Sequence, residues 1–192
     1  MKKDFLTSRE AAKLLAVAVS TVQLWTNNGL LRAWTTGGGH RRIARSSVEE
    51  MLAKQRAVSG DHNAKQQMSI VIVEDDAQQR RLYEKQFISR HIKAHVVMAS
   101  DGYEGLIKIG CIFPDVIISD LMMPNMDGFQ MIRALKELPE LEQSLVIVIS
   151  ALTEKEIQVR GGLPQGVHFF TKPVPFDDLE NLIHKKVHMK VA

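Results

Sequence analysis

The feature that most constrains the fold is a five-fold alternation of short apolar runs with helical patterns in the C-terminal part of the chain. Strands are expected over residues 70–73, 94–98, 116–119, 145–149 and 167–170. Helices are expected over residues 77–90, 102–111 and 129–138, in a short segment after Thr153, and over 177–189. This order of elements builds a parallel sheet with helices on both faces. We therefore expect an α/β fold, a (βα)5 doubly wound parallel sheet.

Polar residues follow four of the five expected strands. The acidic run Glu74-Asp75-Asp76 follows the first strand, Asp120 the third, Ser150 the fourth, and Thr171-Lys172-Pro173 the fifth. Open parallel sheets bind ligands at the carboxyl ends of their strands. These side chains should therefore meet at one edge of the sheet.

The chemistry of these residue types points to a phosphoryl group beside a metal. Clustered carboxylates repel one another unless a cation lies among them, and Mg²⁺ prefers oxygen ligands. A lysine and a hydroxyl at the same edge can hold the oxygens of a phosphoryl group on one carboxylate. A single Asp at a strand end is usually only a helix cap or a solvated group, so the prediction depends on all the positions together.

Residues 68–192 resemble a response-regulator receiver domain, which has a flavodoxin-like fold. The resemblance rests on the acidic pair, on Asp120-Leu121-Met122-Met123-Pro124, on Met126-Asp127-Gly128 and on Lys172-Pro173. It implies that Asp120 is the phosphoacceptor and that Mg²⁺ is bound by Glu74, Asp75, Asp120 and the Met122 backbone carbonyl. It also implies that Ser150 and Lys172 contact the phosphoryl group, and that Pro173 follows a cis peptide bond.

The same resemblance implies a switch and a slow reversal. Asp120 would attack a phosphohistidine of a partner protein, after which Lys172 and Ser150 would move toward the new oxygens. Phe169 matches the switch aromatic, which turns inward when the hydroxyl residue moves. Met122 and Leu152 are apolar and cannot orient a hydrolytic water, so we expect slow self-dephosphorylation and no further enzymatic activity.

The N-terminal residues predict two short helices, a hairpin and a closing helix. Thr7 or Ser8 can cap the first helix, with Glu10 placed for a capping box. Ser20 is a candidate cap for a second helix over residues 21–27, which ends at Asn28-Gly29. Strands over 30–34 and 42–44 flank the glycine-rich tip at 35–41, and Ser46 or Ser47 can cap a last helix with Val48, Met51 and Leu52 inward.

A nucleic-acid surface is expected on the second helix and the hairpin. Val22, Trp25 and Leu30 should point into a small core. The expected DNA contacts are Ser20, Thr21, Gln23, Thr26 and Asn27 on the helix and Gly38, His40, Arg41 and Arg42 in the hairpin. Gln23 can pair with adenine, and arginines contact phosphates or the minor groove.

Residues 5–55 resemble the MerR and excisionase-like winged helix-turn-helix family. The resemblance rests on Ser8-Arg9-Glu10-Ala11-Ala12, Ser20-Thr21-Val22, Trp25, Gly29-Leu30 and the Gly-Gly-His-Arg-Arg wing. Family members often carry arginine just before the helix tryptophan, whereas this chain has Gln23 and Leu24 there. The family implies double-stranded DNA as the partner.

Charge divides the chain in the same way as the motifs. Residues 1–56 carry ten Lys and Arg against four Asp and Glu, a net charge of +6, whereas residues 68–192 carry fourteen against seventeen, a net charge of −3. A basic segment can bind a polyanion. Residues 57–67 are small and polar, as linkers are, so we expect domains over 1–56 and 68–192.

Cysteine content and hydropathy indicate the compartment. The single cysteine, Cys111, has apolar neighbours that suggest a buried thiol, and one cysteine excludes an internal disulfide. The chain contains no membrane-length apolar run and begins without a leader-like segment. We expect a cytoplasmic protein without membrane contact.

Together these expectations describe a bacterial two-component response regulator. A sensor histidine kinase or phosphotransfer protein would phosphorylate Asp120, which would control homodimerisation through the receiver and thereby DNA binding and transcription. The alternative is a receiver-linked adaptor whose N-terminal domain binds a protein partner. Salt-dependent DNA binding separates these functions, because phosphate contacts give a steep salt dependence.

Overall fold

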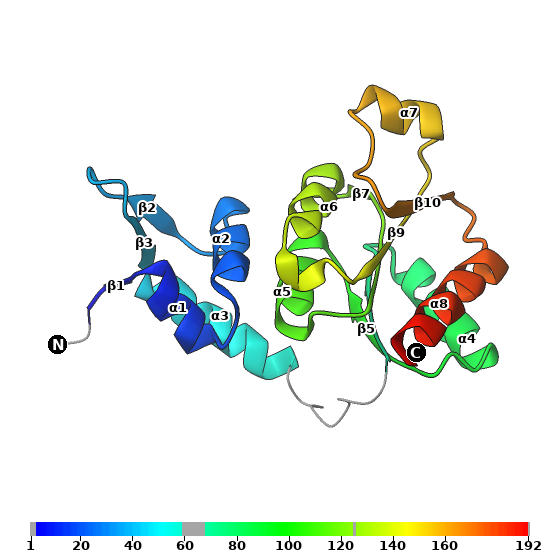
Figure 1. Ribbon diagram of the computed structural model, residues 1–192, viewed down its shortest axis with the longest axis horizontal. Helices are drawn as coiled ribbons and strands as arrows, with labels where there is room; N and C mark the ends of the chain where they lie inside the picture. The colour runs from blue at the N-terminus through cyan, green and yellow to red at the C-terminus, as the bar shows by residue number, and fades with distance from the viewer. Residues whose placement is uncertain (1–2, 59–67, 125, 192) are drawn as a thin grey trace. The chain divides into compact units, whose positions relative to one another are not determined.

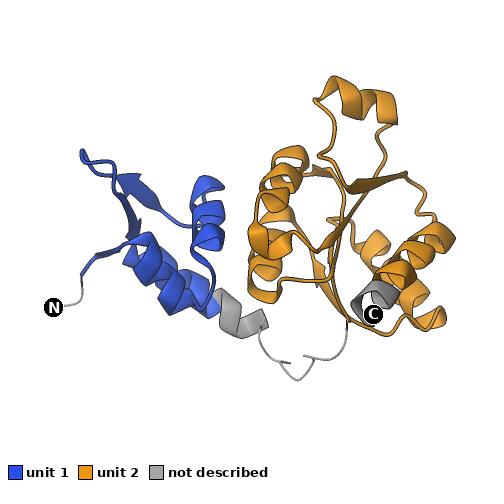
Figure 2. Ribbon diagram, in the orientation of Figure 1, with its two compact units in different colours: residues 1–63 blue, residues 64–192 orange. Residues whose placement is uncertain are grey.

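The computed structural model describes residues 3–58, 68–124 and 126–191, which belong to two compact units, residues 1–63 and 64–192 (Figure 2). The expected linker, 57–67, falls largely outside the described residues, since only 57 and 58 are described and they end a helix. The precise domain boundaries stay a prediction. No helix in the described ranges is long and apolar enough to cross a membrane.

The first unit contains three helices and a small sheet. Its elements are β1 (Phe5–Leu6), α1 (Ser8–Leu15), α2 (Val19–Asn27), β2 (Ala33–Thr35), β3 (Arg41–Ala44) and α3 (Arg45–Val58). The strands pair antiparallel in the order β1-β3-β2. Trp25, Ile43 and Val48 are fully buried and form the centre of the core with Leu15 and Met51. The strand β1 was not predicted, because two residues carry no periodicity.

The helix starts of this unit confirm one predicted cap and correct two others. Thr7 and Glu10 form the expected capping box on α1. The prediction that Ser20 caps α2 was wrong, because the helix begins at Val19 after Ala18. Likewise α3 begins at Arg45, so Ser46 and Ser47 lie in its first turn. The Ser47 hydroxyl instead donates to the Ala44 carbonyl and accepts the Arg32 backbone N–H.

The second unit is a five-stranded parallel sheet covered by helices (Figure 1). Its elements are β4 (Met68–Val73), α4 (Ala77–Ser89), β5 (Ala94–Ala99), α5 (Gly102–Ile112), β6 (Val116–Ser119), β7 (Met122–Met123), β8 (Met126–Asp127), α6 (Gly128–Lys136), η1 (Pro139–Leu141), β9 (Leu145–Ser150), α7 (Glu154–Val159), β10 (Val167–Thr171) and α8 (Phe176–Val191). The sheet order is β10-β9-β6-β4-β5. The predicted (βα)5 fold is therefore confirmed.

Each face of this sheet buries alternate strand residues against a pair of helices. Figure 1 shows α4 and α8 on one side of the sheet and α5 and α6 on the other. On the first side Tyr83, Phe87, Leu179 and Ile183 pack with Ile70, Ile72, Val116 and Ile118. On the second side α5 approaches β4 so closely that a Cβ at Gly105 would lie 2.8 Å from Val73 Cγ1. Strands buried on both faces explain the continuous apolar runs in the sequence.

Cys111 departs from its expected environment. It lies in the last turn of α5 and is half-buried, so the prediction of a buried thiol was wrong. Its apolar sequence neighbours suggested burial, but consecutive helical positions point in different directions, and only one of the faces lies against the sheet.

Candidate functional site

Two adjacent strands bring the predicted carboxylates together. The strand β4 pairs with β6 so that Val73 lies beside Ser119, and the acidic residues follow directly after these two positions. Carboxylate oxygens of Glu74, Asp75 and Asp120 lie within 4.8 Å of one another. Glu74 is 2% exposed and Asp120 6% exposed, whereas Asp75 faces solvent. The predicted meeting point at the edge of the sheet is thus present.

Asp120 is held by three hydrogen bonds. Its Oδ1 accepts the backbone N–H groups of Leu121 at 2.6 Å and of Met122 at 3.0 Å. Its Oδ2 accepts the Lys172 ammonium at 2.7 Å. Donors to both oxygens fix the orientation of this carboxylate.

Lys172 joins the two buried carboxylates. It follows β10, and its backbone N–H donates to the Ser150 carbonyl at 2.8 Å. The ammonium lies 2.7 Å from Asp120 Oδ2 and 2.9 Å from Glu74 Oε2. Burial would lower the pKa of Lys172, but the hydrogen bonds and charges of Asp120 and Glu74 outweigh it and raise that pKa. The expected cis bond between Lys172 and Pro173 is present.

Glu74 lies deepest in the cluster. Burial raises the pKa of its carboxyl group, and this effect exceeds the opposing hydrogen bond and charge of Lys172. The Arg80 side chain donates to the Glu74 and Asp75 carbonyls, each at 2.7 Å, and so fixes the turn after β4. Asp76 instead caps α4 by accepting the Gln78 backbone N–H at 2.6 Å.

Ser150 carries a buried hydroxyl that lacks a partner. It ends β9, the strand beside β6, and is fully buried. Its Oγ and that of Thr21 are the two buried side-chain polar atoms in the described part of the chain without a hydrogen-bond partner. An unpaired buried hydroxyl is costly, so its presence at this edge points to a ligand that completes it.

The remaining predicted residues of this unit differ in where they lie. Met122 is 49% exposed, in a two-residue strand after Asp120, whereas Leu152 is 8% exposed. Phe169 is partly buried in β10 and lines a hollow with Ile157 and Leu163, among others. The structure therefore does not place Phe169 among the carboxylates.

The donor set fits a small hard cation. Three carboxylates converge, and the single ammonium of Lys172 contacts only Glu74 and Asp120, which leaves oxygen atoms available for further positive charge. Oxygen-only ligands with one face open to solvent are typical of Mg²⁺ sites. The cluster of Glu74, Asp75 and Asp120 could thus hold a metal ion.

The first unit presents a different surface, on α2. Gln23 and Asn27 are exposed and Ser20 and Thr26 are partly exposed, as predicted. The prediction that Thr21 faces outward was wrong, because this side chain is fully buried. Thr21 lies four residues before Trp25, so the two share the helix face that packs into the core.

The hairpin between β2 and β3 carries the other predicted contacts. Gly39 adopts a φ of 76°, which allows the turn at the tip, and His40 is exposed. Arg41 donates to the Thr26 hydroxyl at 2.8 Å, and the Arg42 guanidinium lies 5.7 Å from the centre of the Phe5 ring. Phe5 and Trp34, 40% and 48% exposed, stack edge to face and were not predicted as surface residues. Their contact could have been predicted only if β1, which contains Phe5, had been predicted as a strand.

Comparison with known proteins identifies both units. Residues 70–184 match the response regulator receiver domain, and residues 5–56 match a helix-turn-helix domain. The chain belongs to the response regulator receiver family.

Two curated relatives and one solved structure match between about half and two thirds of the chain. A Geobacter sulfurreducens protein-glutamate methylesterase/protein-glutamine glutaminase is 36% identical over 64% of this chain and 32% of its own length. The response regulator PleD of Caulobacter vibrioides is 32% identical over 55% of this chain and 23% of its own length. The N-terminal domain of a Wolinella succinogenes protein of solved structure is 32% identical, with a TM-score of 0.52, over 65% of this chain and 97% of that one.

The chain spans between 10% and 32% of the length of the first curated relatives it matches. These relatives are therefore several times longer than the part of them that matches this chain. This chain joins its receiver domain to a helix-turn-helix domain.

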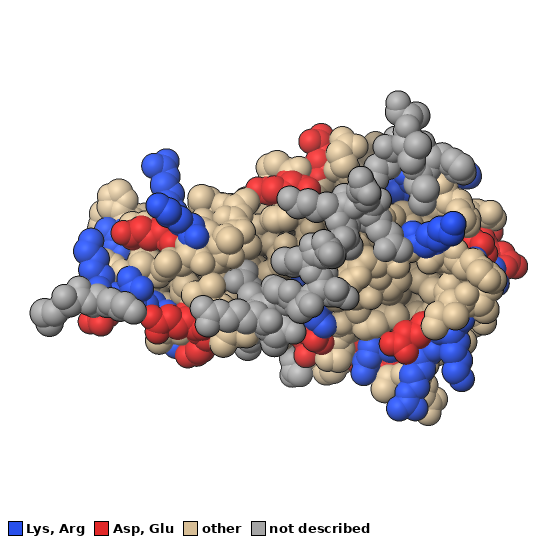
Figure 3. All heavy atoms as spheres, turned by 90° about the horizontal axis from the view of Figure 1, so that it is seen from below, with Lys and Arg blue, Asp and Glu red and all other residues tan. Residues whose placement is uncertain are grey.

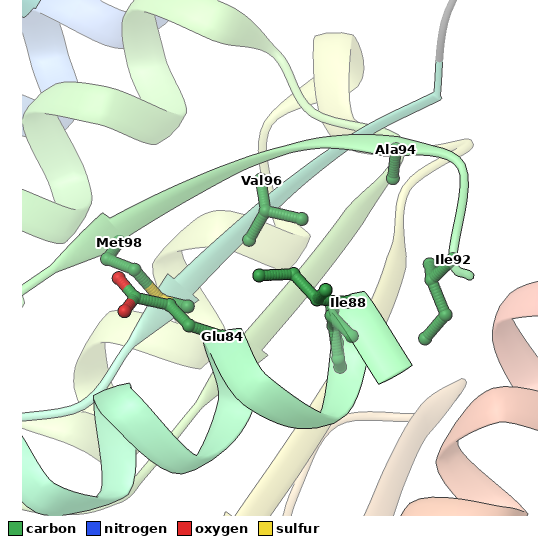
Figure 4. Close-up of a pocket in the computed structure, with 7 residues that line it drawn as sticks. Glu84, Ile88, Ile92, Ala94, Val96 and Met98 are labelled. Atoms are coloured by element: carbon green, nitrogen blue, oxygen red, sulfur yellow. The ribbon is translucent and has the colours of Figure 1, made fainter. Parts of the chain in front are cut away.

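An apolar hollow in the receiver domain lies apart from its acidic cluster. It has a volume of about 270 Å³ and lies between α4 and β5, where Ile88, Ile92 and Val96 line it with Glu84 at one end (Figure 4). Glu84 is its sole charged lining residue. The hollow holds no group that could transfer or bind a phosphoryl group, so it is not part of the site.

Charged side chains are interspersed on the visible surface. Figure 3 shows Lys and Arg projecting from the part formed by residues 1–63, with Asp and Glu between them. The net positive charge of the helix-turn-helix domain is therefore spread among acidic side chains, and the charge that a polyanion meets depends on the face it contacts.

Proposed function

We propose that the chain is a response regulator whose helix-turn-helix domain is controlled by phosphorylation of Asp120. The observation that carries this proposal is the ammonium of Lys172 at 2.7 Å from Asp120 Oδ2, beside two further carboxylates and the unpaired hydroxyl of Ser150. A nucleophile, a cationic clamp and an unused hydrogen-bond donor are what a transferred phosphoryl group requires.

The transfer forms one bond and breaks one bond. A carboxylate oxygen of Asp120 attacks the phosphorus of a phosphohistidine on a sensor kinase or phosphotransfer protein. The phosphorus–nitrogen bond breaks, its electron pair returns to the imidazole, and an acyl phosphate remains on Asp120. Lys172 then exchanges its contact with the carboxylate for the phosphoryl oxygens, and the Ser150 hydroxyl gains the partner that it lacks.

Glu74, Asp75, Asp120 and the backbone carbonyl of Met122 would hold Mg²⁺. The ion supplies positive charge that offsets the repulsion between the carboxylates and the incoming phosphoryl group. The chain's own part is to orient the two buried carboxylates: Lys172 contacts both Glu74 and Asp120, and the Leu121 and Met122 N–H groups fix Asp120.

Movement of Ser150 toward the phosphoryl group would act on the output surface. We infer that Phe169 turns inward as Ser150 moves, which changes the surface formed by α7, β10 and α8 and favours a homodimer through the receiver domain. Met122 and Leu152 offer no group that could orient a hydrolytic water, so the acyl phosphate should persist for minutes or longer. Loss of label from the phosphorylated protein measures this decay, and complete loss within seconds would refute the expectation.

The helix-turn-helix domain, similar to MerR and excisionase-like winged domains, would bind double-stranded DNA and regulate transcription in the cytoplasm. Gln23 is placed to read a base, and Ser20, Thr26, Asn27, Gly38, His40, Arg41 and Arg42 would form the rest of the surface. One small domain binds DNA weakly, so dimerisation would raise the affinity by presenting two domains to one duplex.

Phosphorylation with a small acyl phosphate and Mg²⁺ tests this function. Wild type should gain the mass of one phosphoryl group and change its affinity for DNA, whereas Asp120→Asn should do neither. An unmodified wild type would remove the phosphoacceptor role of Asp120. Modification without any DNA binding at low salt would instead favour the adaptor function, with a protein partner for the N-terminal domain.

A further inference from the structure

Two consecutive arginines of β3 lie on opposite faces of the small sheet. The strand pairs with both β1 and β2, and its Ile43 is fully buried. Side chains alternate along a strand, so Arg41 shares the inner face with Ile43, whereas Arg42 shares the outer face with its cross-strand neighbour Trp34. The two arginines therefore cannot serve the same purpose.

Arg41 reaches from the hairpin to α2. Its guanidinium Nη1 donates to Thr26 Oγ1 at 2.8 Å, and this hydroxyl in turn donates to the Gln23 carbonyl at 2.8 Å. The first bond is partly buried and is assisted by the charge of the guanidinium, which strengthens it. The hairpin and the helix turn from Gln23 to Thr26 are thus joined by one continuous chain of hydrogen bonds.

Arg42 makes contacts of another kind. Its guanidinium lies over the Phe5 ring at 5.7 Å and donates to the Arg41 carbonyl at 3.3 Å. These contacts lie within the sheet and do not reach α2. Arg42 thus provides a matched control for Arg41, adjacent in sequence and equal in charge.

We propose that Arg41 is a positioning residue that sets the orientation of α2 relative to the β2–β3 hairpin, and so determines how well the DNA surface discriminates between base sequences. This rests on the proposed DNA binding. The Thr26 hydroxyl has committed both its proton and an acceptor site to the bridge, so Thr26 and Arg41 support Gln23 rather than read bases themselves. Base readout requires side chains held in a fixed geometry, which a link between two elements provides.

The test compares two substitutions at Thr26. Thr26→Val removes the hydroxyl but keeps the branched shape, whereas Thr26→Ser keeps the hydroxyl. The probe is a duplex that wild type selects from a random-sequence pool, measured against unselected pool DNA. Thr26→Val should lower the ratio of the two affinities about ten-fold, the size of one charge-assisted hydrogen bond. Thr26→Ser should recover most of this ratio.

A double-mutant cycle with Arg41→Gln separates the bridge from direct contacts. Once Arg41 is replaced, Thr26→Val should have little further effect on discrimination. Fully additive losses would show that Thr26 and Arg41 contact DNA independently, which would overturn the proposal. Discrimination unchanged in Thr26→Val would overturn it as well. The intrinsic fluorescence of Trp25 and Trp34 checks that each variant is folded.

The salt dependence of DNA affinity separates a positioning residue from a residue that contacts phosphates. Removing a phosphate contact lowers the slope of log K against log salt by about 0.9. Arg41→Gln should lose discrimination with this slope retained, whereas Arg42→Gln should lower the slope and retain discrimination. The reverse pattern would contradict the assignment. Should wild type select no duplex and bind no DNA, the proposed function itself fails, an outcome distinct from any of these.

Discussion

The hydroxyl of Ser150 is buried without a hydrogen-bond partner, although its backbone carbonyl accepts the Lys172 N–H at 2.8 Å. A buried unpaired hydroxyl lowers the stability of the folded state, since it loses water and gains nothing. Ser150→Ala should therefore leave the free energy of unfolding of the unphosphorylated protein unchanged, or raise it by up to about 1 kcal/mol. Urea unfolding at neutral pH measures this.

The same substitution should weaken the response to phosphorylation. With Ser150 replaced, the phosphoryl group loses a donor, so the change in DNA affinity on phosphorylation should shrink. Ser119→Ala is the control, because the Ser119 hydroxyl donates to the Asp120 carbonyl at 2.8 Å and its loss should destabilise the fold. If Ser150→Ala destabilised the protein as much as Ser119→Ala, the Ser150 hydroxyl would already stabilise the unphosphorylated fold and would not be available to bind a ligand.

Glu104 provides a pH-dependent contribution away from the acidic cluster. Burial would raise the pKa of its carboxyl group, but the hydrogen bond from Lys108 and those from Ser100 outweigh it and lower that pKa. A carboxyl whose pKa is lowered on folding adds stability above its unfolded pKa of about 4.3, and this is lost as the pH falls through the folded value.

Glu104→Gln should thus destabilise the protein at pH 7 by about 1 kcal/mol, allowing for solvent screening of this partly exposed pair. The difference from wild type should shrink as the pH falls below about 4.3. Urea unfolding at several pH values measures it. A difference that stayed constant down to pH 3 would show that the ionised carboxylate contributes nothing.

At the scale of elements, two helices begin with a glycine for different reasons. A Cβ on Gly128, the first residue of α6, would lie 2.6 Å from the Leu121 carbonyl oxygen, in the backbone that holds Asp120. A Cβ on Gly102, the first residue of α5, would lie 2.6 Å from the Met126 sulfur, which can move. The same alanine substitution therefore meets a rigid neighbour in one helix and a flexible one in the other.

Gly128→Ala should lower the free energy of unfolding by about 2 kcal/mol, whereas Gly102→Ala should lower it by less than about 1 kcal/mol. Gly128→Ala should also slow phosphorylation by a small acyl phosphate, because the shift displaces Leu121, whose N–H binds Asp120 Oδ1. Chemical denaturation and the rate of mass gain measure the two effects. Equal effects of both substitutions would show that the loop after β6 adjusts freely.

Elements of the larger unit could be predicted because their signals are long and locally complete. Each strand is an apolar run that ends at a polar residue, and the carboxyl ends of neighbouring parallel strands must meet. The smaller unit gave weaker signals. Ser20 resembled a cap and Thr21 an exposed residue, but burial of Trp25 places Thr21 on the core face. The bridge from Arg41 to Thr26 depends on the register of β3, which no local pattern encodes.

On the scale of the whole molecule, the two parts of the chain differ in the sign of their net charge. Residues 1–56 carry ten Lys and Arg against four Asp and Glu, whereas residues 68–192 carry fourteen against seventeen. The proposed phosphorylation would add negative charge to the receiver domain, which already has a net charge of −3. A gain in DNA affinity on phosphorylation therefore cannot arise from added electrostatic attraction within one chain.

Pairing of two chains on one duplex predicts a particular salt dependence. Each helix-turn-helix domain that neutralises phosphates contributes its own counterion release, so two domains should contribute about twice that of one. The slope of log K against log salt should therefore about double when the phosphorylated and unphosphorylated proteins are compared on the same DNA. Asp120→Asn, treated with the same acyl phosphate, should keep the smaller slope. An affinity that rose with the slope unchanged would mean that a single chain binds more tightly, and control through dimerisation would be wrong.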